Sequence, residues 1–181
     1  MGNVPSSRPQ LTKEAALEKV AAFSVPEKVI LLGIRGYYRD TMGEKGKNDR
    51  GIYDDAIFVI APDYFASFNA NTDPTVKRNG VSVLKPGLHY YKKGRHRISR
   101  PPSYPAFRPD TPGELLPVTR DDIGDSMGIA INIHKGGYNS TSSEGCQTIY
   151  PSQWEAFQTK VYQLMDEAGQ TRIPYILIEQ A

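Results

Sequence analysis

The chain has 181 residues, 39% of them hydrophobic, and a net charge of +2 at pH 7. This length fits one domain, or one domain with an extra lobe, and it is long enough to bury a hydrophobic core. The small net charge argues neither for nor against nucleic acid, no run approaches the roughly 18 apolar residues of a membrane span, and one cysteine excludes an internal disulfide.

The N-terminal residues 1–10 are rich in proline and serine and are predicted to be flexible, ahead of a single domain at 11–181. They lack the basic and then apolar run of a secretory signal peptide. The first helix is predicted at 12–23, because Thr12 can cap its N-terminus and Glu14 suits its first turn.

The first half of the domain has the pattern of a series of β-strands. The apolar run 29–34 predicts a buried strand, and a loop rich in glycine and charge follows it. A strand is predicted at 52–60, where alternation sends one of Asp54 and Asp55 inward, and an inward carboxylate must be paired. Further segments are an ambiguous one at 64–69 and short strands at 81–84 and 88–91.

Residues 92–117 carry most of the prolines and many charges, so they are predicted to form a long Pro/Arg-rich surface excursion with little regular structure. The basic residues at its start are Lys92, Lys93, Arg95, Arg97 and Arg100. The favoured interpretation is a solvated loop. The alternatives are contact with an anionic polymer or a carboxylate substrate, and nucleic-acid binding with nearby tyrosines for stacking.

Residues 127–134 form the clearest predicted strand. Because side chains alternate along a strand, Ile129, Ile131 and Ile133 are expected to face the core. Asn132 and His134 then share the opposite face, with His134 at the end of the strand.

The C-terminal part contains the strongest predicted helix, at 152–168, where Ser152 and Glu155 form a capping-box pattern. A loop of small polar residues at 136–146 precedes it, and a last strand is predicted at 173–178. Many strands and few helices favour an α+β, mainly β class.

Cys146 is the only cysteine, and it follows His134 by twelve residues. A thiolate attacks carbonyl carbon well, and an imidazole can take the thiol proton and later protonate a leaving group. Gly145 allows a tight turn that aims the amides of Gly145 and Cys146 at an oxyanion. The helix that follows is expected to lower the pKa of the thiol. The alternative is a small buried apolar side chain, which free cysteine often is.

Several residues are candidates for supporting this pair. Ser142 and Ser143 can hold the loop through bonds to the backbone or, for Ser143 in particular, contact substrate. Arg35 and Arg120 could bind a terminal carboxylate, although each is more often a surface ion-pair partner. The group that orients His134 stays open between Lys135 O, Gly136 O and a carboxylate.

The segments IHKGG at 133–137 and SEGC at 143–146 resemble the His-Gly … Ser-x-Gly-Cys motif of L,D-transpeptidase (YkuD-like) catalytic domains, as a divergent branch. The resemblance covers 127–160 and extends less distinctly over 29–116. Lys135 interrupts the His-Gly pair, Glu144 stands where the family often has histidine, and Thr148 stands where a basic residue often follows. The spacing from histidine to cysteine is also shorter than in many members.

The resemblance implies an L,D-transpeptidase-like β-sandwich core with an N-terminal helix and a helix after the cysteine loop. It implies Cys146 as nucleophile, His134 as general base, Gly145 at the oxyanion site, and Ser143, Ser142 and Asn132 near the substrate. The expected substrates are peptidoglycan stem peptides, processed through a thioacyl-enzyme by transfer or by hydrolysis of the L,D-carboxypeptidase or endopeptidase type. No metal or organic cofactor is implied.

The absence of a signal peptide leads us to expect action in the periplasm or cell wall after delivery by a lysis or secretion system, for example from a phage. Two other functions stay open. One is a non-catalytic module that binds cell wall or forms part of a phage particle and retains the fold, and the other is nucleic-acid binding. Oligomeric state is not predicted.

Overall fold

The computed structural model describes residues 11–180, so the predicted flexible segment 1–10 lies outside the described residues. In chain order the elements are α1 (Lys13–Ala21), β1 (Ile30–Arg35), β2 (Asp55–Ala61), β3 (Tyr64–Asn71), β4 (Ser82–Leu84), β5 (Gly87–His96), β6 (Tyr104–Pro109), β7 (Leu115–Arg120), β8 (Gly124–Ile129), β9 (Ile133–Lys135), β10 (Gln147–Ile149), α2 (Pro151–Glu167) and β11 (Ile173–Glu179).

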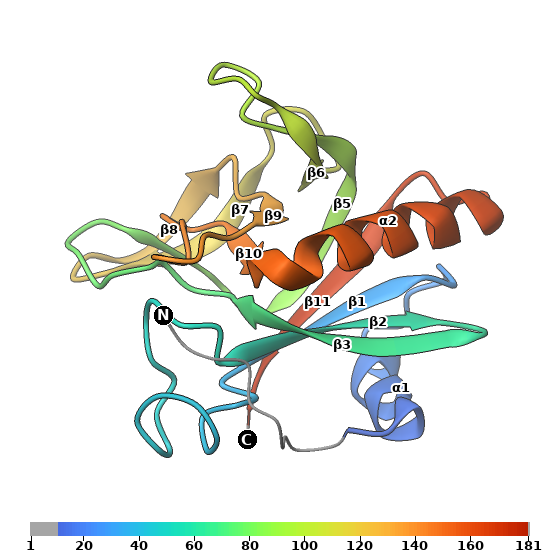
Figure 1. The fold of residues 1–181 in the computed structure, drawn as a ribbon, viewed down its shortest axis with the longest axis horizontal. Helices are drawn as coiled ribbons and strands as arrows, with labels where there is room; N and C mark the ends of the chain where they lie inside the picture. Colours follow the sequence, from blue (N-terminus) through green and yellow to red (C-terminus); the bar gives the residue numbers. More distant parts are fainter. Residues whose placement is uncertain (1–10, 181) are drawn as a thin grey trace.

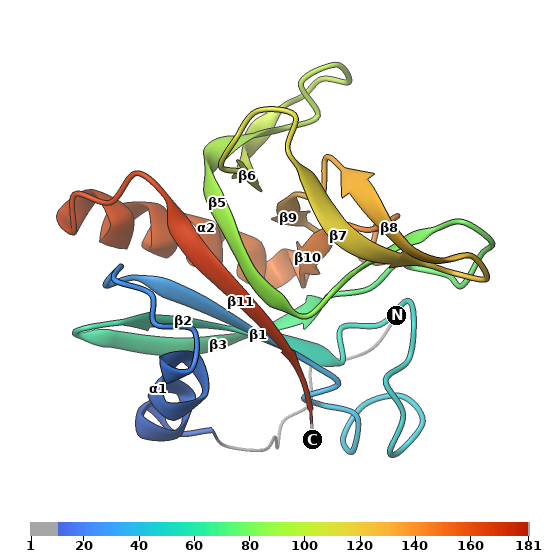
Figure 2. The same cartoon turned by 180° about the vertical axis from the view of Figure 1, so that it is seen from behind.

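Eight strands close into a barrel in the order β1-β11-β5-β6-β9-β10-β3-β2. The strands β4, β7 and β8 form a separate antiparallel sheet that projects to one side of the barrel (Figure 1, Figure 2). The α+β, mainly β class is therefore confirmed. The expected sandwich is replaced by a closed barrel, because each of the eight strands is paired with a neighbour on both edges.

The sheet around β1 is buried on both faces. Leu31 lies in a core that combines residues of all eight barrel strands with the apolar stripe of α2, including Trp154 and Phe157. Leu32 faces the opposite way into a second core, which α1 covers with Ala16. Burial on both faces explains why this strand is a continuous apolar run rather than an alternating one.

Both predicted helices are present, with one difference in how they begin. Thr12 caps α1, because its hydroxyl accepts from the Ala15 N–H at 3.1 Å. The capping box predicted for α2 is wrong, because this helix begins one residue earlier, with Pro151 in its first turn and no side-chain cap bond. Neither helix within residues 11–180 is both long and apolar enough to cross a membrane.

The excursion predicted at 92–117 is largely regular. Strands β5 and β6 form an antiparallel hairpin in which His96 is paired with Tyr104, and β7 begins at Leu115. The prolines misled the prediction because Pro101 and Pro102 lie in the hairpin turn, whereas Pro105 and Pro109 lie within β6 itself.

The strand predicted at 127–134 is interrupted. It ends as β8 at Ile129 and resumes as β9 at Ile133, because Ala130 adopts a left-handed backbone with φ of 55°. The break turns Ile129 outward, with 65% of its surface exposed, whereas Ile131 and Ile133 are buried as expected. The expected shared isoleucine face is therefore wrong for Ile129.

Both Asp54 and Asp55 are fully buried, although alternation predicted that only one would be. The pattern does not apply to Asp54 because β2 begins at Asp55. Asp55 accepts from the N–H groups of Gly36 (2.6 Å) and Thr72 (2.7 Å), and Asp54 accepts from the Asp49 N–H at 2.7 Å. These carboxylates hold the long loop after β1 against the barrel.

Candidate functional site

The loop between β9 and β10 returns the chain so that its two ends lie side by side in parallel strands. Thr148 is the register partner of His134, and partners in a ladder point to the same face. Cys146 lies two residues before Thr148 and shares that face. The pairing continues beyond the strands, because the Gln147 N–H donates to Asn132 O at 2.9 Å. Cys146 and His134 are thus diagonal neighbours on one face.

The thiol of Cys146 is partly buried and is held by the break between β8 and β9. Its Sγ accepts from the Asn132 N–H at 3.4 Å and donates to Ala130 O at 3.3 Å. Among residues 11–180, no hydrogen bond joins this sulfur to the ring of His134. Proton transfer between them therefore requires the thiol to turn away from Ala130 O.

His134 is buried, and its ring is fixed from two sides. Its Nδ1 lies 2.8 Å from Lys135 O, and the Tyr104 hydroxyl lies 3.4 Å from the same nitrogen. The ring of His96 stacks on it with centroids 3.8 Å apart and planes 9° apart. A backbone carbonyl at Nδ1 favours the tautomer that leaves Nε2 as the proton acceptor. Of the three orienting groups left open by the sequence, Lys135 O has this position.

The resting pair is uncharged. Burial raises the pKa of the Cys146 thiol to about 11, against a smaller lowering by the Asn132 N–H and the Arg108 guanidinium. Burial and the neighbouring His96 lower the pKa of His134 to about 4. The expected lowering of the thiol pKa by the following helix is wrong, since α2 begins only at Pro151 and burial outweighs its dipole.

The turn before Cys146 is held by Ser143. The Ser143 hydroxyl donates to Cys146 O at 2.6 Å and accepts from the Gly145 N–H at 3.1 Å. Its backbone exchanges two bonds with Thr75, at 2.9 Å and 2.8 Å. The side chain is buried and fully used within the protein, so Ser143 holds the loop, and its expected contact with substrate is not supported.

Gly145 adopts a φ of 140°, and a Cβ there would lie 3.1 Å from Ser82 O, so this turn requires glycine. Because its N–H is donated to Ser143, the Cys146 amide is the better placed of the two amides expected to bind an oxyanion. Ser142, in contrast to Ser143, is exposed. Asn132 is buried beside the thiol, with a side-chain Oδ1 that has no hydrogen-bond partner.

One cavity is lined by His134, and a second is lined by a residue that contacts the thiol. One, of about 500 Å³, is lined by His134, His96, Tyr104 and Ser142 together with the basic residues of the hairpin turn. The other, of about 340 Å³, is lined by Ala130, whose carbonyl holds the thiol, and by Arg108 and Lys92. Volumes of this size suit small ligands or short peptide segments.

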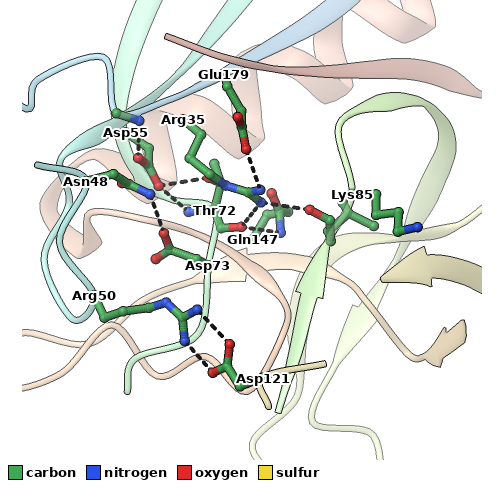
Figure 3. A network of polar contacts seen from close by, with 12 residues as sticks. Arg35, Asn48, Arg50, Asp55, Thr72, Asp73, Lys85, Asp121, Gln147 and Glu179 are labelled. Carbon is green, nitrogen blue, oxygen red and sulfur yellow. Dashed lines mark hydrogen bonds and ion pairs between the residues drawn. The ribbon is translucent and has the colours of Figure 1, made fainter. Parts of the chain in front are cut away.

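Arg35 and Arg120 do not line these cavities, so the structure gives no support to the predicted role in binding a substrate carboxylate. Arg35 is buried and donates to Thr72 O and Leu84 O at 2.6 Å and 2.9 Å (Figure 3). Arg120 lies in the small sheet, where it donates to Gly80 O at 3.0 Å, to Met127 O at 2.9 Å and to nearby serine hydroxyls. Both join backbone segments together.

Gln147 connects the cysteine loop to the barrel interior, and the sequence gave no signal for this role. Its Nε2 donates to Thr72 O (3.2 Å) and Gly145 O (3.3 Å), and its Oε1 accepts from the Tyr175 hydroxyl at 2.7 Å. Figure 3 shows Gln147 beside Thr72 and Arg35 in this network. The position of Cys146 therefore depends on a buried amide that directly follows it.

His96 and Tyr104 are the site residues that the sequence analysis missed. They come from the hairpin β5–β6, in the segment that was expected to be irregular. The tyrosines Tyr90, Tyr91 and Tyr104 are the signal that could have identified strands there, because aromatic residues favour strands.

No group of three or more His, Cys, Asp and Glu side chains in the described part of the chain is arranged to hold a metal ion. No family model matches the chain, no curated protein matches its sequence and no solved structure matches its fold. The chemistry of the site must therefore be argued from its own geometry.

Proposed function

We propose that this protein is a cysteine-dependent enzyme acting on peptidoglycan stem peptides, of the L,D-transpeptidase or L,D-carboxypeptidase type. The observation that carries the proposal is the parallel pairing of β9 with β10, which places Cys146 and His134 on one face while Lys135 O takes Nδ1 of the imidazole. The motif resemblance at 133–146 supplies the substrate class.

In the proposed reaction, the thiol turns from Ala130 O toward Nε2 of His134 and gives up its proton as Sγ attacks the carbonyl carbon of an L-to-D peptide bond. The Cys146 N–H binds the oxyanion. The C–N bond breaks as His134 protonates the leaving amine, which leaves a thioester on Cys146. Water or an acceptor amine then attacks the thioester, and His134 takes and returns the proton.

Because both groups are neutral at rest, attack and proton transfer are coupled in this scheme. The pKa of the thiol is far above that of the imidazole, so a preformed thiolate–imidazolium pair is disfavoured. Substrate binding excludes water and places a carbonyl where charge develops, which the Arg108 guanidinium of the second cavity favours.

The experiment that tests the proposal is incubation of purified muropeptides with the wild type and with Cys146→Ala, followed by mass spectrometry. Loss of terminal D-Ala, its exchange for an added D-amino acid, or cleavage of cross-links identifies carboxypeptidase, transferase or endopeptidase. Product that requires Cys146 supports the proposal, and unchanged muropeptides at high protein concentration contradict it.

The second candidate is a non-catalytic cell-wall-binding or phage-particle module. The observation that favours it is the thiol itself, which is bonded to Ala130 O rather than to the imidazole. This function predicts that muropeptides bind without reacting and that Cys146→Ala leaves their affinity unchanged.

A further inference from the structure

The cavity beside His134 is strongly basic. Arg97, Arg100 and Lys135 line it, and no aspartate or glutamate of the described chain does. All three are exposed, and none of them forms an ion pair within residues 11–180. Cations at a concave surface without counter-charges attract an anionic ligand.

The hairpin turn presents these cations in a defined way. Arg97 has a left-handed backbone with φ of 62°, and its Nε donates to Arg100 O at 3.0 Å. The Nη groups of Arg97 have no partner among the described residues and remain available. Lys135 approaches from β9 with its Nζ 5.6 Å from the centre of the Tyr104 ring. Two elements far apart in the sequence thus bring their positive charges to one cavity.

The charge of the turn reaches the rings that line the cavity. Arg97 lies close enough to lower the pKa of His96, although burial is the larger cause, and it opposes the rise that burial causes in the pKa of Tyr104. His96 stacks directly on the proposed base, so a ligand held by the cations lies beside the reacting groups.

We propose that Arg97, Arg100 and Lys135 form a carboxylate subsite that makes the protein select stem peptides with free side-chain carboxyl groups over peptides in which those groups are amidated. The inference rests on the proposed function for the identity of the peptide. Guanidinium groups bind carboxylates through paired, charge-assisted hydrogen bonds, and an amide can supply only a weaker neutral acceptor.

The test measures binding separately from chemistry. The full chain carrying Cys146→Ala is titrated by calorimetry at low salt with two synthetic stem tetrapeptides, which differ only in whether the side-chain carboxyl groups are free or amidated. We expect the free form to bind about tenfold more tightly, which corresponds to about 1.4 kcal/mol. The preference should shrink as salt screens the charges.

Substitutions assign the preference to the cavity. Adding Arg97→Gln and Arg100→Gln should reduce the preference to about twofold or less, because most of the cavity's charge is removed. Lys19→Gln is the matched control, since it removes an exposed charge from α1, which lies across the barrel from the hairpin turn (Figure 1). It should leave the preference unchanged.

Equal binding of the two peptides, no binding of either, or a preference that survives the double substitution would each overturn the subsite. Inorganic phosphate that displaces the free peptide where acetate at equal ionic strength does not would show a phosphate site instead. Acylation of wild-type Cys146 is scored independently. Acylation without the binding preference removes the subsite and keeps the enzyme, and the preference without acylation does the reverse.

Discussion

At the scale of single residues, Cys146 and His134 are both neutral, and burial is the main reason. Burial raises the pKa of the thiol to about 11 and lowers that of the imidazole to about 4, because both charged forms are poorly solvated. A histidine poised in this way can accept a proton at neutral pH without first losing one. A neutral pair therefore fits the proposed general-base activation better than a stored thiolate.

Alkylation of Cys146 reports its protonation state directly. Since iodoacetamide reacts with the thiolate, the labelling rate should increase with pH through the range 7 to 10 and level off only near the raised pKa of about 11. Intact-protein mass spectrometry measures the rate, with Cys146→Ala as the unlabelled blank. A rate that is already constant below pH 8 would show an activated thiolate and contradict this assignment.

His96 is predicted to tune His134 through its stacked ring. After burial, His96 is the next cause that lowers the pKa of His134. His96→Phe keeps an aromatic ring in the stack and removes the titratable group, so the pKa of His134 should rise above about 4. Ring-proton NMR titration measures it, and Lys19→Gln, an exposed change on α1, is the control that should leave it unchanged. An unchanged or lower value in His96→Phe would contradict the interpretation of the stack.

At the scale of elements, the site is built where strands end. The break at Ala130 supplies the carbonyl that holds the thiol, and Ser143 holds the turn that returns the chain to β10. Neither feature is a regular helix or strand. Each places backbone groups around Cys146 that a continuous strand would use in its ladder.

Ser143→Ala should destabilise the protein by about 1–3 kcal/mol, because it leaves the buried Gly145 N–H without its acceptor and Cys146 O without its donor. Ser142→Ala is the matched control in the same loop, and its exposed side chain should contribute less than about 0.5 kcal/mol. Urea denaturation of both variants measures the difference. Equal stabilities would show that Ser143 does not hold the turn.

Sequence patterns correctly located the elements in which apolar residues form a continuous run or recur with the period of a helix. The apolar run at 29–34 corresponds to β1, and the stripe at 152–168 corresponds to α2. The hairpin β5–β6 was not predicted, because its prolines were interpreted as those of an irregular loop. The anchoring role of Gln147 could not be inferred, because it depends on Thr72, a partner distant in the chain.

At the scale of the whole molecule, the carboxyl groups of Asp54, Asp55 and Asp73 are buried near a single buried cation of the described chain, the guanidinium of Arg35. Burial and the charge of Asp55 raise the pKa values of Asp54 and Asp73, and one carboxylate oxygen of each has no hydrogen-bond partner within residues 11–180. Arg35 lies near Asp55 and Asp73 and opposes the rise in the pKa of both (Figure 3). The fold therefore holds carboxyl groups near the loop after β1 whose ionised form is disfavoured by burial.

This cluster predicts how stability depends on pH. An acid whose folded pKa is raised binds its proton more tightly in the folded state, so its contribution to stability is lost as pH rises above the unfolded value of about 3.8. Asp54→Asn should therefore stabilise the protein at pH 8, with a gain that decreases toward pH 4. Urea midpoints at several pH values measure it, beside the exposed control Asp63→Asn. A gain that is constant with pH would contradict a charge effect.

The central claim, that Cys146 is the nucleophile and His134 its base, is tested most directly by trapping the acyl-enzyme. The wild type, His134→Gln and Cys146→Ala are each mixed with a stem tetrapeptide, quenched in acid and examined by intact-protein mass spectrometry. We predict a thioester adduct on Cys146 in the wild type and no adduct in Cys146→Ala. In His134→Gln the adduct should form at least about a hundredfold more slowly. An adduct that forms equally fast in His134→Gln, or the absence of any adduct and product with the wild type, would contradict it.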